Sequence, residues 1–495
     1  MFCRDRDLPL KYSFDMHATR HLPAVRPAGS AFLPWLFLVL AATALAFLPV
    51  PVAAVLVAGL AFVVALILEP VVGLYALAIC IPVGPVLRVP LGPASLGVTD
   101  LLVGATTAAW FLRQVVRQTP LRPAPLLWFL TPLAVALLYS TLPAHSLEQS
   151  LPELAKWGEV LVTYFLAVQL LSERQRLPFV LVLITAAAME STVGLRQFVY
   201  RIGPDAYLLG SYLRAYGTFG QPNPFAGYLG LVLPIALALG LWALGAALQT
   251  HGVMRLRLLA LAGYALAATA VIAAGVFASW SRGAWLGAAA GVAAVLVLIS
   301  RAGRILVLAG ALLALLAFPV LPVAVHDRLA DFARYFGTWN ARGVPVDDAN
   351  FSVLERVAHW QVAWEMFADH PWLGIGVGNW DVIYSKYAFG RWTEPMGHAH
   401  NALFHFAAEA GLLGAITYLW FWLGSLGAAL VALHRHRNMQ RALCVGVFGL
   451  LVHLSVHNQF ENLFVQGMPL LVALALALLA LERGPGLMPP NRVAS

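Results

Sequence analysis

Two histidines and an asparagine close the longest polar segment of this 495-residue chain. The segment runs from His326 to Asn401, and its last residues read Met396-Gly-His-Ala-His-Asn. The unperturbed pKa of a histidine, about 6.5, suits general-base catalysis at a hydroxyl group. His398 and His400 are therefore candidate proton acceptors, and Asn401 suits the N-cap of the helix that follows.

The same segment does not carry the pattern of a metal or nucleotide site. No cysteine lies near the histidine pair, and Glu394 and Glu409 stand at no recognised ligand spacing. Gly374-Ile-Gly-Val-Gly-Asn superficially resembles a phosphate-binding loop, but no strand precedes it and no Lys-Ser/Thr follows. We predict no metal and no cofactor.

Two arginines stand in tight turns that precede apolar stretches. Arg214 begins Arg-Ala-Tyr-Gly-Thr-Phe-Gly-Gln-Pro-Asn-Pro, and Arg282 lies at the centre of Ser279-Trp-Ser-Arg-Gly-Ala-Trp. A guanidinium group binds phosphate or pyrophosphate through two hydrogen bonds. An arginine near mid-membrane costs about 2.5–3.5 kcal/mol, and less at the boundary, so both positions invite a functional interpretation. The alternative is snorkelling, or a carboxylate partner such as Glu190 or Glu461.

The turn after Arg214 is rich in glycine and proline. Its structural interpretation is a turn at the start of a helix. Such a turn could also expose backbone N–H groups to an anionic ligand. We expect Arg201, Gln221 and Asn223 from this region to bind substrate, together with His398 and Asn401.

The composition requires a membrane protein. Hydrophobic residues make up 61% of the chain, charged residues 11%, and the mean hydropathy is +0.79. About fourteen apolar runs reach spanning length, so we predict an all-α integral membrane protein, a multispanning bundle of about 12–14 transmembrane helices with one large loop. The predicted parts are an N-terminal tail at 1–30, a membrane domain of about eleven helices at 31–325, the loop at 326–401, C-terminal helices at 402–482 and a tail at 483–495.

The basic residues predict the orientation. Most of the 31 Lys and Arg residues fall in alternate loops and both tails if the two termini are cytoplasmic. The net charge of +8 is then inner-leaflet anchoring and gives no nucleic-acid signature. The turns with Arg214, Arg282 and the two histidines lie together on the outer face, as do His457, Asn458 and Glu461 before the last span.

A helix in the large loop is amphipathic. Large apolar residues recur at helical spacing at Val353, Val357, Trp360, Trp364 and Phe367, which predicts a helix on the outer membrane boundary or over a cavity. His359 and His370 are interpreted as surface or packing histidines. Six tryptophans of the loop could stack on sugars or form a core or interfacial belt: Trp339, Trp360, Trp364, Trp372, Trp380 and Trp392.

These fragments resemble the O-antigen ligase and polymerase superfamily of bacterial lipid-linked-oligosaccharide transferases. The likeness rests on Arg214 leading into Gly-Thr-Phe-Gly-Gln-Pro-Asn, on the Ser281-Arg282-Gly283 turn, and on the loop that contains Glu355-Arg-Val-Ala-His-Trp and Asp369-His-Pro-Trp-Leu-Gly-Ile-Gly-Val-Gly-Asn. The loop ends in His398-Ala-His-Asn-Ala-Leu, with Glu409-Ala-Gly-Leu-Leu-Gly after it. Order and spacing fit over roughly residues 200–420.

The resemblance implies a GT-C-like helical membrane fold in the bacterial inner membrane, with a periplasmic active site and metal-independent catalysis. It implies a donor glycan on undecaprenyl pyrophosphate, with Arg214 and Arg282 holding the pyrophosphate. His400 would be the base or the acceptor-orienting group. The usual acceptor is lipid A-core, in lipopolysaccharide biosynthesis.

Several functions stay open. The first expectation is a ligase that moves a polymeric glycan to lipid A-core or a similar acceptor. A polymerase of O-antigen or exopolysaccharide, or a protein O-oligosaccharyltransferase, would use the same donor chemistry. A transporter or flippase is the alternative from another class, and it would depend on carboxylates within spans such as Glu159 or Glu190.

Overall fold

The structure is a computed structural model that describes residues 43, 47–91, 94–323, 325, 326, 330, 339–347 and 350–480. It divides into two units, Met1–Val64 and Ala65–Ser495. The predicted tails at 1–30 and 483–495, and the first predicted span near Ala31, lie outside the described residues.

The described chain is mainly helical. Its α-helices are α2 (Val50–Leu68), α3 (Val71–Val83), α4 (Val98–Arg117), α5 (Leu127–Ser140), α6 (Leu147–Leu170), α7 (Glu173–Tyr200), α8 (Pro222–Leu248), α9 (Gly252–Ala278), α10 (Arg282–Ile299), α11 (Arg301–Ala317), α13 (Phe351–Asp369), α14 (Trp380–Tyr387), α15 (Ala402–Arg435), α16 (Asn438–His457) and α17 (Met468–Ala477). Two small antiparallel hairpins, β1 (Arg88–Leu91) with β2 (Ala94–Gly97) and β3 (Leu208–Leu209) with β4 (Tyr212–Leu213), were not predicted.

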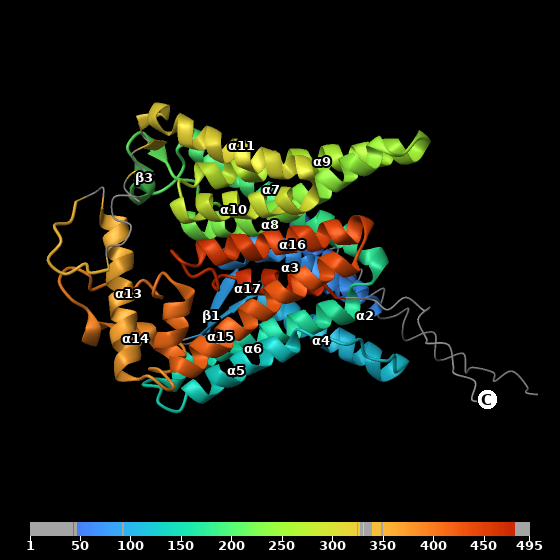
Figure 1. Ribbon diagram of the computed structural model, residues 1–495. Coiled ribbons are helices and arrows are strands. Elements are labelled where there is room, and N and C mark those ends of the chain that lie inside the picture. The colour runs from blue at the N-terminus through green and yellow to red at the C-terminus, as the bar shows by residue number, and fades with distance from the viewer. Residues whose placement is uncertain are drawn as a thin grey trace, which may run out of the picture. The chain divides into compact units, whose positions relative to one another are not determined.

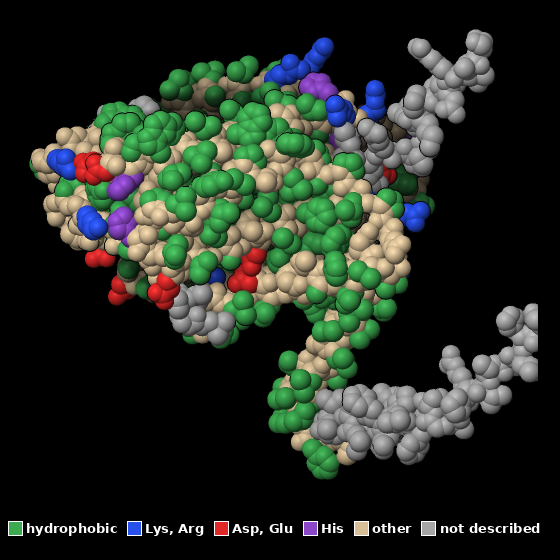
Figure 2. Space-filling view, turned by 90° about the horizontal axis from the view of Figure 1, so that it is seen from below, with side chains coloured by type: hydrophobic (Ala, Val, Ile, Leu, Met, Phe, Trp, Pro, Cys, Tyr) green, Lys and Arg blue, Asp and Glu red, His purple; other side chains and the backbone are tan. Residues whose placement is uncertain are grey.

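The helices confirm an all-α multispanning membrane protein. Eight helices of the described residues are long and apolar enough to cross a bilayer, and three apolar helices of 10–17 residues accompany them. Figure 2 shows hydrophobic side chains over most of the visible surface of the second unit, with charged ones gathered near its two ends. The sequence predicted about 12–14 spans, more than these eight. Part of the difference comes from α4 and α6, which lie near predicted runs but carry charged residues such as Asp100 and Glu159.

Helices α8, α10 and α16 pack side by side at the centre of the second unit (Figure 1). Glycines make this close approach possible, because a Cβ added at Gly446 would lie 2.7 Å from the Ile235 Cα, and one at Gly291 would lie 2.8 Å from the Gly449 carbonyl oxygen. Small residues allow membrane helices to approach in this way. The packing sets the ends of the three helices at fixed positions relative to one another.

The polar segment folds around α13 and α14. Val362, Met366, Trp380, Ile383 and Tyr384 form a small hydrophobic core between these helices and the start of α15. The predicted amphipathic helix is present as α13, but its apolar residues divide. Val353, Val357 and Trp360 line a cavity, whereas Trp364 is exposed.

The glycine run at 374–378 joins this segment to the membrane helices. Ile375 N–H donates to the Ala408 carbonyl, and Gly376 N–H to the Glu409 carbonyl, each at 3.0 Å. Gly411 has a φ of +64° and breaks the helical pattern of α15 just beyond these carbonyls. The run is therefore a backbone clamp, and the resemblance to a nucleotide loop was correctly set aside.

We expect Gly374→Ala to open this clamp. Gly374 has a φ of +71°, and a Cβ there would lie 2.3 Å from the Glu409 carbonyl carbon. The left-handed backbone alone costs an alanine about 1–2 kcal/mol. Because the clash adds to this cost, we expect the free energy of unfolding to fall by more than that amount. The thermal midpoint of the purified protein in detergent measures it.

Gly390→Ala is the matched control, because Gly390 has a φ of +58° and nothing within 4 Å of an added Cβ. It carries the backbone cost without the clash. Equal falls in thermal midpoint for the two variants would contradict the proposed clamp.

Candidate functional site

Several helix ends meet beside α13. The Arg214 Nε donates to the Ser279 carbonyl at 2.9 Å, which joins the segment before α8 to the turn before α10. Ala402 N–H donates to the Asn458 carbonyl at 3.1 Å, which joins the start of α15 to the end of α16. A cavity of about 990 Å³ lies among these ends and α13. The turns that the sequence placed on one face thus do share one side of the bundle.

Glu461, in the segment after α16, is the hub of this cavity. Its Oε1 lies 2.9 Å from the His400 Nδ1 and 3.1 Å from the His398 Nε2. Its Oε2 accepts a hydrogen bond of 2.7 Å from the Asn223 Nδ2. The Arg356 Nη2 lies 3.7 Å from the same oxygen. One buried carboxylate therefore joins three separate segments of the chain.

The hydrogen bonds assign the tautomers of the two histidines. The His398 Nδ1 accepts from the His400 backbone N–H at 3.1 Å, so its Nε2 carries the proton that faces Glu461. In the neutral tautomer that donates from Nδ1 to Glu461, the His400 Nε2 is unprotonated, and that nitrogen has no hydrogen-bond partner. Of the two histidines, His400 alone has a nitrogen available to accept a proton.

The backbone at this point is specialised. His400 has a φ of +51°, a left-handed conformation that costs a non-glycine residue about 1–3 kcal/mol. Asn401 caps α15, since its Oδ1 accepts from the Phe404 N–H at 3.1 Å. The predicted N-cap is confirmed, and it fixes where the His400 side chain leaves the backbone.

The cavity keeps Glu461 ionised and His398 neutral. Burial alone would raise the pKa of Glu461, but His400, His398 and Arg356 outweigh it and hold that pKa well below its usual range. Burial, with the neighbouring His400, lowers the pKa of His398 to about 3 against the opposing pull of Glu461. At neutral pH the contact between His398 and Glu461 is thus a hydrogen bond from a neutral ring to a carboxylate.

Three arginines supply positive charge. The Arg214 Nη2 donates to the Asn223 Oδ1 at 3.0 Å, and Arg282 donates to the Ser352 hydroxyl. The Arg356 Nε donates to the Phe460 carbonyl at 2.7 Å. Burial and the charges of Arg356 and Arg282 lower the pKa of Arg214 to about 10, so it still carries its proton at neutral pH. A cavity with this charge favours an anionic ligand.

Most predicted site residues line this one cavity, namely His398, His400, Asn401, Arg214, Gln221, Asn223 and Arg282. Arg201 does not: it is exposed at the end of α7, where it takes a left-handed φ of +52° as the helix C-cap. The structure does not bring Arg201 to this cavity, and its role in substrate binding stays a prediction.

Two charged residues of the site were missed or underrated. Arg356 stands within the quoted Glu355-Arg-Val-Ala-His-Trp fragment, but the sequence analysis gave it no role of its own. The sequence placed Glu461 on the outer face and offered it as a possible partner of an arginine, but it did not pair it with the histidines. His359, in contrast, is a packing histidine as predicted, buried with Nδ1 2.7 Å from the Glu355 carbonyl oxygen.

Two histidines and a carboxylate raise the question of a metal. Within the described part of the chain, His398, His400 and Glu461 have ligand atoms within 4.8 Å of one another. These ligand types would suit a divalent cation. The neighbouring arginines, with Arg356 3.7 Å from Glu461, would repel one. The expectation of a metal-free site stays a prediction.

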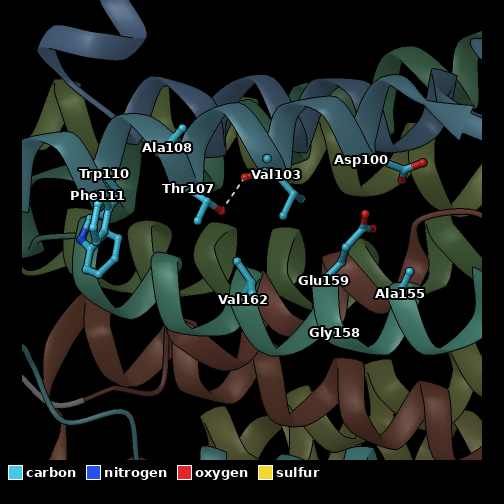
Figure 3. A pocket seen from close by; sticks show the side chains of 11 residues that line it. Asp100, Val103, Thr107, Ala108, Trp110, Phe111, Ala155, Gly158, Glu159 and Val162 are labelled. Carbon is cyan, nitrogen blue, oxygen red and sulfur yellow. Dashed lines mark hydrogen bonds between the residues drawn. The ribbon is translucent and has the colours of Figure 1, made fainter. Parts of the chain in front are cut away.

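A second groove, of about 590 Å³, lies between α4 and α6 (Figure 3). Asp100 and Glu159 face each other across it, and apolar side chains line most of the rest. The other carboxylates predicted within spans hold backbone segments: Glu190 accepts from the Thr218 N–H at 2.7 Å, and Glu409 from the Trp380 N–H at 3.1 Å. Glu159 is thus the carboxylate on which the transporter alternative can rest.

The fold and the cavity define a multi-pass membrane protein with a buried basic site at the ends of its helices. Residues 267–419, from within α9 to within α15, match the model of the O-Antigen ligase family, Wzy_C. The match supports the resemblance to the O-antigen ligase superfamily that the sequence motifs predicted. It contains Arg282, Arg356 and both histidines, whereas Arg214 and Glu461 lie outside it. No curated protein matches the chain significantly.

The histidine cluster predicts how stability depends on pH. Because the folded state holds the pKa of His398 at about 3, below the unfolded value of about 6.5, its contribution is complete above pH 6.5 and declines as the pH falls. At pH 5 the loss is about 2 kcal/mol. Glu461 contributes fully above its unfolded pKa of about 4.5, so it does not act in this window.

The thermal midpoint in detergent, measured between pH 7.5 and pH 5, tests this expectation. His398→Gln should reduce the dependence without abolishing it, because burial also lowers the pKa of His359, to about 4. His434→Gln, at an exposed position near the end of α15, should leave it unchanged. An unchanged slope in His398→Gln would contradict the assignment of a neutral buried ring.

Proposed function

We propose that this protein is a glycosyltransferase of the ligase type. It moves a glycan from undecaprenyl pyrophosphate to lipid A-core or a similar acceptor. The observation that carries the proposal is the meeting of a base-competent His400, held by Glu461, with three arginines in one cavity. The superfamily itself implies a ligase- or polymerase-type function on lipid-linked glycans within a membrane.

The donor would be held through its pyrophosphate. Arg214 and Arg282 both line the cavity, and Asn223 links Arg214 to Glu461. Guanidinium groups bind phosphate oxygens bidentately and offset the charge that develops on a departing pyrophosphate. Arg356 is committed to the Phe460 and Ser352 carbonyls, so we assign it the role of holding α13 and Glu461 in place.

The reaction needs one bond made and one broken. The acceptor hydroxyl oxygen attacks the anomeric carbon, the bond from that carbon to the pyrophosphate oxygen breaks, and undecaprenyl pyrophosphate leaves with the bonding electron pair. The hydroxyl proton passes to the His400 Nε2, and Glu461 stabilises the resulting imidazolium through Nδ1. Because that Nε2 is enclosed, the side chains around it must shift to admit the hydroxyl while Nδ1 keeps its contact with Glu461.

The membrane placement belongs to the same proposal. We propose the bacterial inner membrane, with both termini cytoplasmic and the cavity open to the periplasm, because the basic loops favour that orientation. The large loop at 326–401 would then be periplasmic, between membrane domains at 31–325 and 402–482. A GT-C-like arrangement and metal-independent catalysis complete this picture.

Other acceptors would use the same site. A polymerase would seat a second lipid-linked repeat unit, and a protein O-oligosaccharyltransferase would seat a serine or threonine. The donor chemistry is the same in each case. Glycolipids of a strain that lacks the gene separate them, because a ligase loss leaves bare lipid A-core and long chains on the carrier, whereas a polymerase loss leaves at most one repeat on the core.

We expect Arg282→Ala to lower glycan transfer by about 100-fold or more, because a charge-stabilising donor is lost. Glu159→Gln, in the groove between α4 and α6, should transfer normally. The measurement is the envelope glycolipid profile of the deletion strain complemented with each variant, with membrane levels checked by immunoblot. Full function in Arg282→Ala with loss in Glu159→Gln would favour a transporter and overturn the proposal.

The two histidines should also differ. His400→Ala should lower the rate of transfer by about 10²–10⁴-fold, as removal of a general base does. His398→Gln keeps a side chain that can donate to Glu461, so we expect a loss of less than about tenfold. The rate of transfer by purified protein in lipid nanodiscs measures both, and the reverse order would assign the base to His398.

A further inference from the structure

The six tryptophans of the large loop fall into three groups in the structure: buried, exposed outside the cavity, and lining the cavity. Trp380 and Trp392 are buried in small hydrophobic cores, at 1% and 6% exposure. Trp364 and Trp372 are exposed but do not line the cavity. Trp339 and Trp360 line the cavity, which the sequence pattern could not show.

These two indoles belong to one aromatic wall. The ring centroids of Trp339 and Trp360 lie 6.1 Å apart, and those of Trp360 and Phe404 also lie 6.1 Å apart. Trp339 is 69% exposed although it lies outside the apolar helices. A large aromatic face left in contact with water at a cavity mouth is typical of a binding surface.

The wall is tied to the proposed base. The Trp360 Nε1 donates to the His400 carbonyl oxygen at 3.4 Å, a long hydrogen bond that sets the indole beside the strained backbone of His400. A ligand stacked on Trp360 is therefore next to the residue that would accept the proton. The arginines that would hold the donor come from other segments, before α8 and at the start of α10.

We propose that Trp339 and Trp360 form a subsite for a sugar ring of the glycosyl acceptor. The inference rests on the proposed function and names the class of its second substrate. The C–H bonds on one face of a pyranose carry partial positive charge, and the face of an indole ring carries partial negative charge, so the two stack. The exposed Gln459 also lines the cavity and supplies an amide for hydrogen bonds to sugar hydroxyls, whereas the Asn401 amide is engaged with the Phe404 N–H and with Gln459.

The test measures acceptor and donor separately. Purified protein in lipid nanodiscs is given lipid-linked glycan as donor and delipidated core oligosaccharide as acceptor. Trp339→Ala and Trp360→Ala should each raise the KM for the acceptor by about threefold to tenfold, as the loss of an aromatic contact does. The KM for the donor should stay within about twofold, and Trp339→Phe should keep most of the acceptor affinity.

Trp364→Ala is the matched control, because Trp364 lies on α13 one turn beyond Trp360 and is exposed outside the cavity. It should leave both KM values unchanged. Trp339→Ala should not disturb folding, because the side chain is largely in solvent. A change in its acceptor KM can therefore be assigned to the lost contact. An unchanged acceptor KM in both cavity variants, or an equal rise in the donor KM, overturns the subsite.

A binding measurement separates failure of the subsite from failure of the proposed function. Core oligosaccharide is titrated into His400→Ala, with and without Trp339→Ala, and intrinsic fluorescence is followed. Binding that weakens about threefold to tenfold with the second substitution supports the subsite independently of turnover. Equal binding in the two proteins overturns the subsite alone, whereas full transfer by both His400→Ala and Arg282→Ala overturns the proposed function.

Discussion

The buried carboxylate of Glu461 is the constraint on which the site depends. It is 4% exposed and takes contacts from the end of the large loop, from the start of α8 and from α13. A buried charge is tolerated only when partners satisfy it, and removal of a partner leaves an uncompensated charge that costs several kcal/mol. The arginines of the cavity would repel one another without this anion, so Glu461 holds together a cluster of positive charge that a ligand can then use.

The membrane helices make that hub possible. Gly446 and Gly449 of α16 and Gly291 of α10 let three helices approach closely, and Pro234 of α8 fills part of the space. His453 lies in the same contact, where an added Cβ at Gly230 would reach its ring. Such packing leaves little freedom for the helices to slide. Asn223 at the start of α8, Arg282 at the start of α10 and Glu461 just after α16 therefore keep their relative positions. The glycine clamp at 374–378 fixes the large loop to α15 through backbone hydrogen bonds.

The sequence predicted the membrane class and most residues of the site for a physical reason. Each apolar run that crosses the bilayer carries the chain to the other side, so loops separated by an even number of runs lie on the same side. This rule predicted that Arg214, Arg282, His398 and His400 lie together. The pairing of His400 with Glu461 could not be predicted, because 61 residues separate them and only the packed ends of α15 and α16 bring them together. Arg356 was not singled out because its helix has an ordinary amphipathic pattern. Arg201 was expected beside the other site residues because the position of a residue in a loop does not predict where its side chain lies, and the structure places it away from the cavity.

The positive charge of the cavity links the two proposed tasks of the site, donor binding and proton transfer. Burial, the neighbouring His400 and the charge of Arg356 together lower the pKa of His398, which keeps it neutral at physiological pH. A bound pyrophosphate would offset that charge, so a proton taken up by a neighbouring histidine would then cost less. By linkage, a protonated histidine would in turn hold the anionic donor more tightly. The arginines that would hold the donor therefore also set the charge that a protonated imidazole would meet, which ties proton transfer to occupancy of the donor site.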